Sequence, residues 1–282
     1  MRKVQPGELL RMKQRNEKIV MTVCYDYPSA ALVEKAGIHS IIVGVSVGKA
    51  VLGYPGSVPV TVDEVLHHTK AVARGAKNCL VISDMPFLSY TSAEEAIRNA
   101  GRFVKEGGAD GVKLEGGGRV AETISAVVGA GIPVLGHIGA SLFIMELDGA
   151  VEQGTTADEA VRVVDDVRTL EEAGVFAILM EAVPYEVMKI VMDTATVPVI
   201  SLGSGRASDG QLLIFHEMMG LGDIFIPKCV KRYANLGEIV LGALERYADE
   251  VRSGSFPSDE HTFFMSRTEL EKLEQKMKTK GG

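Results

Sequence analysis

Short runs of apolar residues recur along the whole chain and are separated by longer segments of mixed polarity. Each run is nearly continuous and rich in Val and Ile, whereas a strand with one solvated face alternates apolar and polar residues. The runs are therefore predicted to be buried strands of a parallel sheet. Eight of them follow one another: IVMTVCY from Ile19, SIIVGV from Ser40, CLVIS from Cys79, GVKL from Gly111, PVLGH from Pro133, FAILME from Phe176, PVISLG from Pro198 and DIFIPK from Asp223.

Segments with the apolar spacing of amphipathic helices lie between most of these runs. Several of them stop at a glycine just ahead of the next run, where helices commonly end in the left-handed conformation. A strand and a helix repeated eight times predict an α/β fold, a (β/α)8 barrel, with a doubly wound open sheet as the alternative. The clearest helical segments are Val62 to Arg74, Ala93 to Lys105, Thr156 to Ala173 and Asp209 to Met219.

The chain is predicted to be a single barrel domain over residues 1–282 with a helical extension at its C-terminal end. Its 282 residues suit a barrel, which needs about 250, and no linker rich in Pro, Gly or Ser divides them. The segment from Pro6 to Arg15 is expected to close the bottom of the barrel. Ser266 to Lys280 is expected to form the additional C-terminal helix.

Composition and charge narrow the range of partners. The chain is 46% hydrophobic and carries 30 basic against 37 acidic residues, so its formal charge of −7 gives no footprint for DNA or RNA. No apolar run approaches the ~18 residues of a membrane span, and the first residues lack the apolar stretch of a signal peptide. A cytoplasmic protein is expected. Cys24, Cys79 and Cys229 are too few and too far apart for a metal knuckle or a disulfide framework, and are read as small core residues.

Polar residues close most of the apolar runs, and these are the positions where a barrel carries its chemistry. If the barrel prediction is right, they converge on one mouth. They are Tyr25 and Asp26 after the first run, Ser46, Asp84, Lys113 with Glu115, His137, Glu181, Ser204 with Arg206, and Lys228 after the last.

Asp84 and Glu115 are the metal candidates, because hard oxygen ligands at the ends of neighbouring strands suit Mg²⁺. The alternative is that each caps a helix or pairs with Lys113. Glu181 is the candidate base, since an apolar wall would raise its proton affinity, although a solvated loop carboxylate is an equal alternative. His137 is expected either to orient a ligand or to be a structural histidine.

The loop from Gly203 to Arg206 has the composition of the phosphate cup that barrels often build after their seventh strand. Glycine-rich loops after barrel strands are also common without a ligand, and that reading is favoured. The remaining histidines, at positions 39, 67, 68 and 216, lie in or beside helical patterns and are interpreted as packing or surface residues.

From about Lys18 to Phe264 the sequence resembles the ketopantoate hydroxymethyltransferase (3-methyl-2-oxobutanoate hydroxymethyltransferase) family. The resemblance rests on many motifs in the family's order, which no short pattern would produce by chance. They are CYDY at 24–27, SVPVTVDEVLHHTKAVARGA at 57–76, DMPF at 84–87, GVKLEGG at 111–117, PVLGHIG at 133–139, EAVP at 181–184, SDGQLLIFHE at 208–217, FIPK at 225–228 and FPSDEHTF at 256–263.

The resemblance implies a barrel of the phosphoenolpyruvate/pyruvate superfamily that depends on Mg²⁺. It implies a small-molecule 2-oxo acid as substrate, 5,10-methylenetetrahydrofolate as one-carbon donor, ketopantoate for pantothenate biosynthesis as product, and a homo-oligomer, usually a decamer. Carried over by position, Glu181 is the base. Ser46, Asp84, Lys113 and His137 would hold the 2-oxo acid, and Asp84 and Glu115 would reach the metal.

Two departures from the family's pattern bear on this assignment. The second strand of the family ends in Gly-Asp-Ser with the aspartate as a metal ligand, whereas this chain has Val45 between Gly44 and Ser46. The loop from Gly139 to Gly154 also differs, apart from its end at Gln153 and Gly154. Two alternatives to a hydroxymethyltransferase therefore stay open: a paralogue that applies the same enolate chemistry to another 2-oxo acid, as a carbon–carbon lyase or aldol-type transferase, and a non-catalytic oligomeric barrel.

Overall fold

The computed structural model describes residues 3–140, 153–222 and 227–280. Its central feature is a closed barrel of eight parallel strands, each hydrogen-bonded to the next along the chain, and β8 pairs with β1 to complete the ring. The (β/α)8 prediction is confirmed. The strands are β1 (Ile19–Val23), β2 (Ser40–Val43), β3 (Leu80–Asp84), β4 (Gly111–Glu115), β5 (Val134–Gly139), β6 (Ala177–Glu181), β7 (Val199–Leu202) and β8 (Gly210–Ile214).

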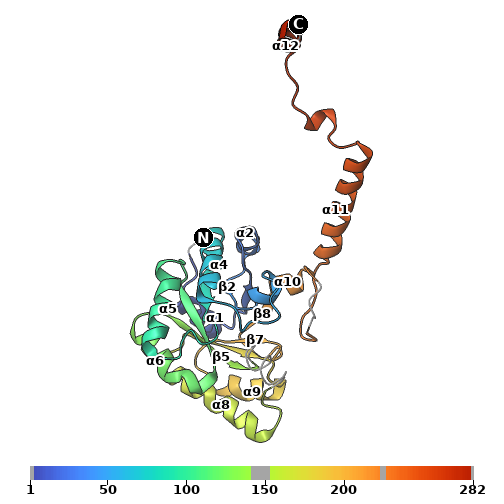
Figure 1. Cartoon of the computed structure of the whole chain (residues 1–282). Helices are drawn as coiled ribbons and strands as arrows, with labels where there is room; N and C mark the ends of the chain where they lie inside the picture. The colour runs from blue at the N-terminus through green and yellow to red at the C-terminus, as the bar shows by residue number, and fades with distance from the viewer. Residues whose placement is uncertain (1–2, 141–152, 223–226, 281–282) are drawn as a thin grey trace. The chain divides into compact units, whose positions relative to one another are not determined.

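Helices surround the barrel on the outside (Figure 1). Four begin at a residue whose side chain caps the free backbone N–H groups, and Thr61 and Thr156 form reciprocal capping boxes with Glu64 and Glu159. The helices of this part are α1 (Pro6–Gln14), α2 (Tyr27–Lys35), α3 (Val47–Ala50), α4 (Val62–Gly75), α5 (Ala93–Lys105), η1 (Gly117–Val120), α6 (Ala121–Gly129), α8 (Ala157–Glu172), α9 (Tyr185–Thr194) and α10 (Phe215–Met218).

The eighth strand is not where the apolar pattern placed it. The expected helix from Asp209 to Met219 is wrong, because Gly210–Ile214 is β8 and only Phe215–Met218 is helical. The expected strand from Asp223 falls largely on residues 223–226, which lie outside the described residues, and Lys228 stands in a turn. Hydrogen bonding to both β7 and β1 outweighs the local helical spacing here.

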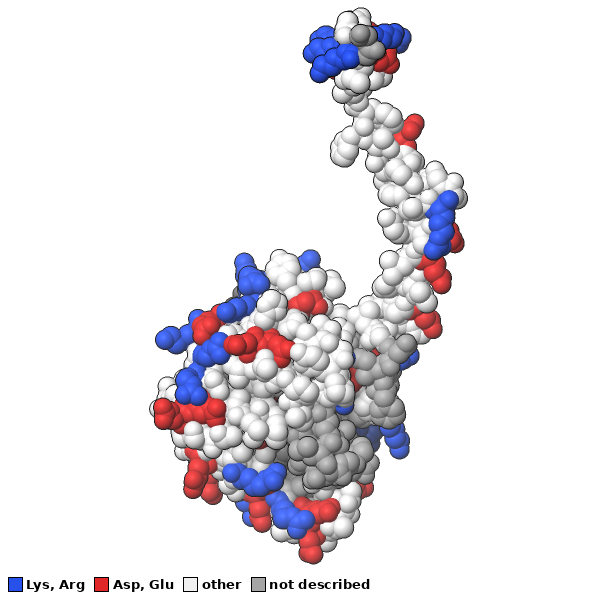
Figure 2. Space-filling model, viewed as in Figure 1, with Lys and Arg blue, Asp and Glu red and all other residues white. Residues whose placement is uncertain are grey.

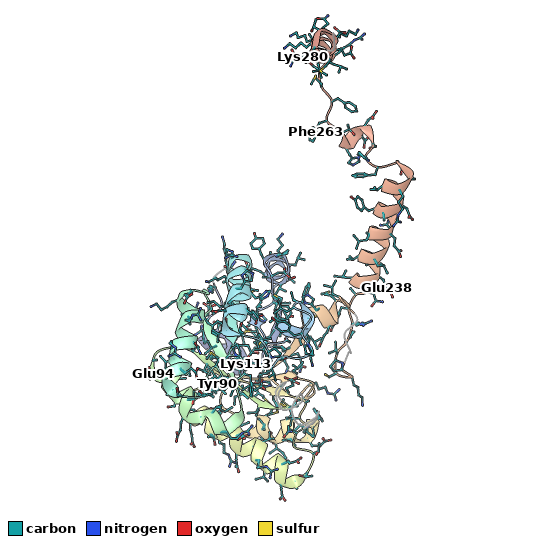
Figure 3. The ribbon with its side chains drawn as sticks, viewed as in Figure 1. Tyr90, Glu94, Lys113, Glu238, Phe263 and Lys280 are labelled. Carbon is teal, nitrogen blue, oxygen red and sulfur yellow. The ribbon has the colours of Figure 1, made fainter. Side chains whose placement is uncertain are left out.

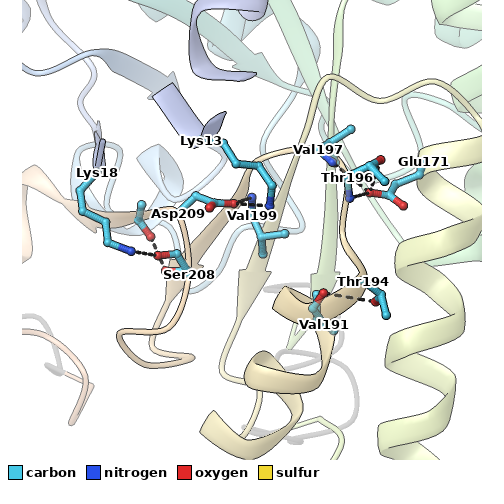
Figure 4. Close-up of polar contacts among 11 residues, drawn as sticks. Lys13, Lys18, Glu171, Val191, Thr194, Thr196, Val197, Val199, Ser208 and Asp209 are labelled. Carbon is cyan, nitrogen blue, oxygen red and sulfur yellow. Dashed lines mark hydrogen bonds and ion pairs between the residues drawn. The ribbon is translucent and has the colours of Figure 1, made fainter. Parts of the chain in front are cut away.

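The end of the barrel opposite the mouth is held by polar contacts of α1 and of the segments that lead into the strands. Lys13 Nζ lies 2.9 Å from Asp209 Oδ2, and that oxygen also accepts a hydrogen bond from the Val199 amide (Figure 4). Glu171, in the last turn of α8, accepts hydrogen bonds from both amides of the segment before β7, Thr196 and Val197. These contacts fix the strand entrances, and α1 covers the bottom as expected.

A second compact unit follows from Asn235 to Gly282. It contains α11 (Leu236–Ser253), η2 (Asp259–His261) and α12 (Arg267–Lys280), and the last of these agrees with the expected C-terminal helix. The helices of the described residues include none that is long and apolar enough to cross a membrane. On the barrel face shown in Figure 2, Lys and Arg side chains are interspersed with Asp and Glu.

Candidate active site

Five ionisable side chains lie at the carboxyl ends of four neighbouring strands, β3 to β6. The parallel register sets Asp84 beside Lys113 and Glu115 beside His137. Lys113 and Glu115 are two positions apart on β4, so both side chains project from the same face of the strand. Figure 3 shows Lys113 inside the barrel, whereas Glu94 lies on its outer side. The barrel therefore brings together residues that are far apart in the sequence.

These side chains form a continuous row of ionisable groups, in which Lys113 Nζ also lies 3.2 Å from His137 Nδ1. Lys113 Nζ lies 3.0 Å from Asp84 Oδ2 and 3.7 Å from Glu115 Oε2. His137 continues the chain, with Nδ1 3.3 Å from Glu115 Oε2 and Nε2 3.2 Å from Glu181 Oε2. The side chains of Asp84, Lys113, Glu115 and His137 are at most 5% exposed, but that of Glu181 is 16% exposed. Glu181 is thus the member of the chain most accessible to a ligand entering the mouth.

The neighbouring carboxylates raise the pKa of both basic groups in this row, Lys113 and His137. Burial lowers the pKa of Lys113, but the carboxylates of Asp84 and Glu115 outweigh this effect, and the pKa lies above its ordinary value. Burial and the Lys113 charge both lower the pKa of His137, yet Glu115 and Glu181 outweigh them and raise it. Burial raises the pKa of Asp84, and Lys113 opposes that shift. Three carboxyl groups and two cations leave one net negative charge when all five are ionised.

Ser46 joins the site from the second strand. It stands before α3 but its hydroxyl makes no capping bond, and instead lies 2.7 Å from the hydroxyl of Tyr25. The residue before it, Val45, donates its backbone N–H to Asp84 Oδ2 at 3.2 Å. Ser46 is therefore tied to the charged chain through one residue of backbone, and all six predicted site residues lie at one end of the barrel.

The residues present suit a metal only in part. Asp84 Oδ1 is a buried carboxylate oxygen that accepts no hydrogen bond from the described residues, so it could serve as a ligand. Val45 is fully buried and offers only an apolar side chain. Within the described parts of the chain, no three His, Cys, Asp or Glu side chains are grouped as metal ligands. A cation at Asp84 would need further oxygens from water or substrate.

Other polar residues at the strand ends have structural tasks. Asp26 caps α2 by accepting a hydrogen bond from the Ser29 amide. Ser204 is buried. Its hydroxyl accepts a hydrogen bond from the Val183 amide and donates one to the Met180 carbonyl, so it is not free to bind a phosphate. Arg206 is exposed. In the altered loop between Gly139 and Gly154, residues 141–152 lie outside the described residues.

Sequence reasoning missed the carboxylate of Glu217, which lies in α10 just after β8. His216, interpreted above as a packing or surface residue, packs its ring against that of Tyr25, with the ring centroids 5.3 Å apart. Glu217 beside it has a pKa raised to about 7, first by burial and then by the charge of Glu181. A signal was present, because the pair His-Glu directly follows the apolar run that is β8. The wrong assignment of that run to a helix concealed it.

A cavity of about 490 Å³ adjoins the charged chain at His137. It opens between the ends of β4 and β5 and the outer helix α8, and Arg119, Arg162 and Gln153 lie along it. Its volume is within the range of sites for small molecules and cofactors. The cavity therefore has room for a small molecule next to His137.

Comparison with known proteins identifies the family. A sequence profile described as ketopantoate hydroxymethyltransferase matches residues 3–259. The chain belongs to the ketopantoate hydroxymethyltransferase family. A relative from Moorella thermoacetica, named 3-methyl-2-oxobutanoate hydroxymethyltransferase, is 50% identical over 258 residues, which cover 91% of this chain and 96% of that protein. The chain is accordingly an enzyme of the transferase class, and the family's reaction belongs to pantothenate biosynthesis.

Solved structures place this member of the ketopantoate hydroxymethyltransferase family in a wider fold group. A phosphonopyruvate hydrolase, in complex with oxalate and Mg²⁺, aligns with a TM-score of 0.61 at 14% identity and covers 99% of this chain and 97% of that one. A 2,3-dimethylmalate lyase, described as a PEP mutase/isocitrate lyase superfamily member, aligns with a TM-score of 0.59 at 16% identity, with 98% and 97% covered. At these identities the likeness shows the fold alone, which is the (β/α)8 barrel that was expected.

Proposed function

We propose that the barrel mouth transfers the one-carbon unit of 5,10-methylenetetrahydrofolate to C3 of 3-methyl-2-oxobutanoate. Glu181 removes the C3 proton, and the electron pair left on C3 forms the new bond to the one-carbon unit. Water supplies the hydroxyl oxygen, and tetrahydrofolate leaves. The products are ketopantoate and tetrahydrofolate.

The observation that carries the proposal is the accessibility of Glu181 at the end of a buried charged chain. A general base must reach a carbon-bound proton, and Glu181 is the carboxylate of the chain that is open to the mouth. His137 Nε2 lies 3.2 Å from Glu181 Oε2, and this contact limits the orientation of the carboxylate. The floor formed by Asp84, Lys113 and Glu115 stays shielded from water, which strengthens its interaction with charge on the substrate.

Binding of the 2-oxo acid is assigned to the other end of the chain. Lys113 supplies a cation for the carboxylate or keto oxygen, and Ser46 supplies a hydrogen bond. His137 lines the site, and Asp84 lies beside Lys113. The formal charge of the five groups is −1, so an anionic substrate alone would be repelled. A divalent cation reverses the sign and favours binding of the carboxylate.

Mg²⁺ is the cation that we propose, with Asp84 and Glu115 as its protein ligands. The unpartnered Asp84 Oδ1 supports this assignment. When bound, Mg²⁺ would withdraw electrons from the keto and carboxylate oxygens and so acidify the C3 proton. Val45 offers no ligand. This protein therefore depends on substrate oxygens to complete the metal site, and it does so more strongly than a protein with aspartate at position 45 would.

The folate donor is assigned to the cavity of about 490 Å³ beside His137. A donor there would approach from the α8 side, while the 2-oxo acid occupies the charged chain. This arrangement brings the two reacting carbons to the same part of the mouth.

Exchange of the C3 proton of 3-methyl-2-oxobutanoate in D₂O tests the base without any folate donor. We expect Glu181→Gln to slow this exchange by at least about 100-fold, because general bases contribute roughly 10²–10⁴ in rate. Glu186→Gln, an exposed carboxylate on the following helix, is the matched control and should exchange at the parent rate. Undiminished exchange in Glu181→Gln would refute the mechanism. Exchange of a different 2-oxo acid in its place would favour the paralogue alternative.

We also propose that the enzyme is a homo-oligomer. In the unit from Asn235 onward, α11 buries none of its residues and exposes Val240, Leu244, Tyr247 and Val251 at helical spacing along one stripe. Such a stripe is costly to leave in water, and a second copy of the chain is the occupant that we assign to it.

A further inference from the structure

Tyr25 occupies an unusual position between β1 and the substrate end of the mouth. Its side chain is completely buried, although it carries a hydroxyl group. His68 bonds to its backbone carbonyl through Nδ1 at 2.8 Å, and the rings of His68 and His216 pack around it. These contacts hold the ring in place. The phenol oxygen then reaches Ser46 Oγ at 2.7 Å.

The direction of this hydrogen bond follows from the inventory of donors and acceptors. Ser46 Oγ is the only partner of the Tyr25 hydroxyl among the described residues. Burial raises the pKa of Tyr25 above its ordinary value, so the phenol keeps its proton. A buried hydroxyl that fails to donate is destabilising, so the proton of Tyr25 is given to Ser46.

The consequence concerns the hydroxyl proton of Ser46. Ser46 is only partly buried and does not cap α3, so once it accepts from Tyr25 its own O–H points to another acceptor. A carboxylate has acceptor oxygens only and suits this donor. Because hydrogen bonds in a row polarise one another, donation by Tyr25 also strengthens donation by Ser46.

We propose that Tyr25 is a positioning residue that donates its hydroxyl proton to Ser46 and thereby fixes Ser46 as a donor to the carboxylate of the 2-oxo acid. This inference rests on the proposed function, because it takes Ser46 as a substrate contact. Tyr25 itself does not touch the substrate. It acts on binding of the 2-oxo acid and not on the folate donor.

A double-mutant cycle tests the proposal on the full chain with Mg²⁺ and both substrates. The proteins are the parent, Tyr25→Phe, Ser46→Ala and the double variant, and each is measured for kcat and for the KM of both substrates. Tyr25→Phe keeps the ring and removes only the hydroxyl. We expect it to raise the KM for 3-methyl-2-oxobutanoate about 5- to 20-fold, with the KM for the donor changed less than about twofold.

The decisive comparison is made in the Ser46→Ala background. If Tyr25 acts only through Ser46, the double variant has the KM of Ser46→Ala within about twofold. A purely structural role of Tyr25 predicts instead that its effect multiplies that of Ser46→Ala, and this result would overturn the proposal. An unchanged KM in Tyr25→Phe would overturn it too.

Two further measurements keep the outcome interpretable. Tyr27→Phe, an exposed tyrosine two positions along, is the matched control and should leave both KM values unchanged. If Ser46→Ala leaves the KM for the 2-oxo acid unchanged while Glu181→Gln still abolishes C3 exchange, the Tyr25 inference fails and the proposed function stands. If C3 exchange survives Glu181→Gln, the proposed mechanism fails instead.

Discussion

Val45 is a buried apolar residue at the position where the resemblance described above implies a metal-binding aspartate. Its backbone amide still bonds Asp84, so the local chain path supports the site without the side chain. We expect Val45→Asp to lower the free energy of unfolding by about 3 kcal/mol when Mg²⁺ is removed, because an uncompensated carboxylate is buried next to Asp84. Mg²⁺ should restore most of this loss, since a ligand that binds only the folded state stabilises it.

Urea unfolding with and without Mg²⁺ measures the effect. Val47→Asp is the control, because Val47 is also fully buried two positions along and lies in α3. It should be destabilised to the same extent in both conditions. Equal behaviour of the two variants would show that no cation binds beside residue 45.

Single residues of the mouth could be predicted because a polar residue at the end of a buried, apolar strand stands out in the sequence. Asp84, Lys113, His137 and Glu181 interrupt or end apolar runs, and closure of the barrel then brings them together. The bond from Tyr25 to Ser46 could not be predicted in this way. Its formation depends on ring packing by His68 and His216, which lie on other elements.

Among the elements, β8 is the one where local pattern and tertiary structure disagree. Gly210 opens this strand, and a Cβ atom there would lie 2.4 Å from the Ile19 carbonyl oxygen of β1. The close approach requires glycine. This close approach could not be predicted from the sequence, because a glycine ahead of an apolar segment is equally compatible with the start of a helix. In contrast, two helices were predictable because a polar capping residue stands just before an apolar spacing typical of a helix. They are Val62–Gly75 and Ala93–Lys105.

We expect Gly210→Ala to lower the free energy of unfolding by about 1–3 kcal/mol, since the new methyl group forces β8 away from β1. Gly101→Ala is the matched control. Gly101 lies within α5 with no atom within 4 Å of the added Cβ, so the substitution should stabilise the protein by about 0.5–1 kcal/mol. Chemical unfolding of both variants gives the comparison. A Gly210→Ala protein as stable as the parent would show that the strand pair tolerates the wider separation.

At the scale of the whole molecule, assembly is the property that the α11 stripe predicts. We expect sedimentation to give a mass that is a multiple of the 30.2 kDa chain. Leu244→Lys places a charge within the stripe and should shift the mass to a smaller species, because burial of an unpaired ammonium is unfavourable. Glu245→Lys introduces the same side chain one position away, outside the stripe, and should leave the mass unchanged. A parent protein that sediments only as a 30 kDa species would contradict the proposal.

Closure of the ring by β1 and β8 has a consequence for the growing chain on the ribosome. The Thr22 hydroxyl bonds Leu213 across 191 positions, and Lys13 pairs with Asp209 across 196. At about 5–20 residues per second, β1 is translated roughly 10–40 s before its partner strand exists. During that interval one edge of β1 has no native partner, and unpaired edges invite association with other chains. Nascent barrels are therefore most vulnerable to misassembly, and most in need of a holding chaperone, until residue 214 has left the exit tunnel.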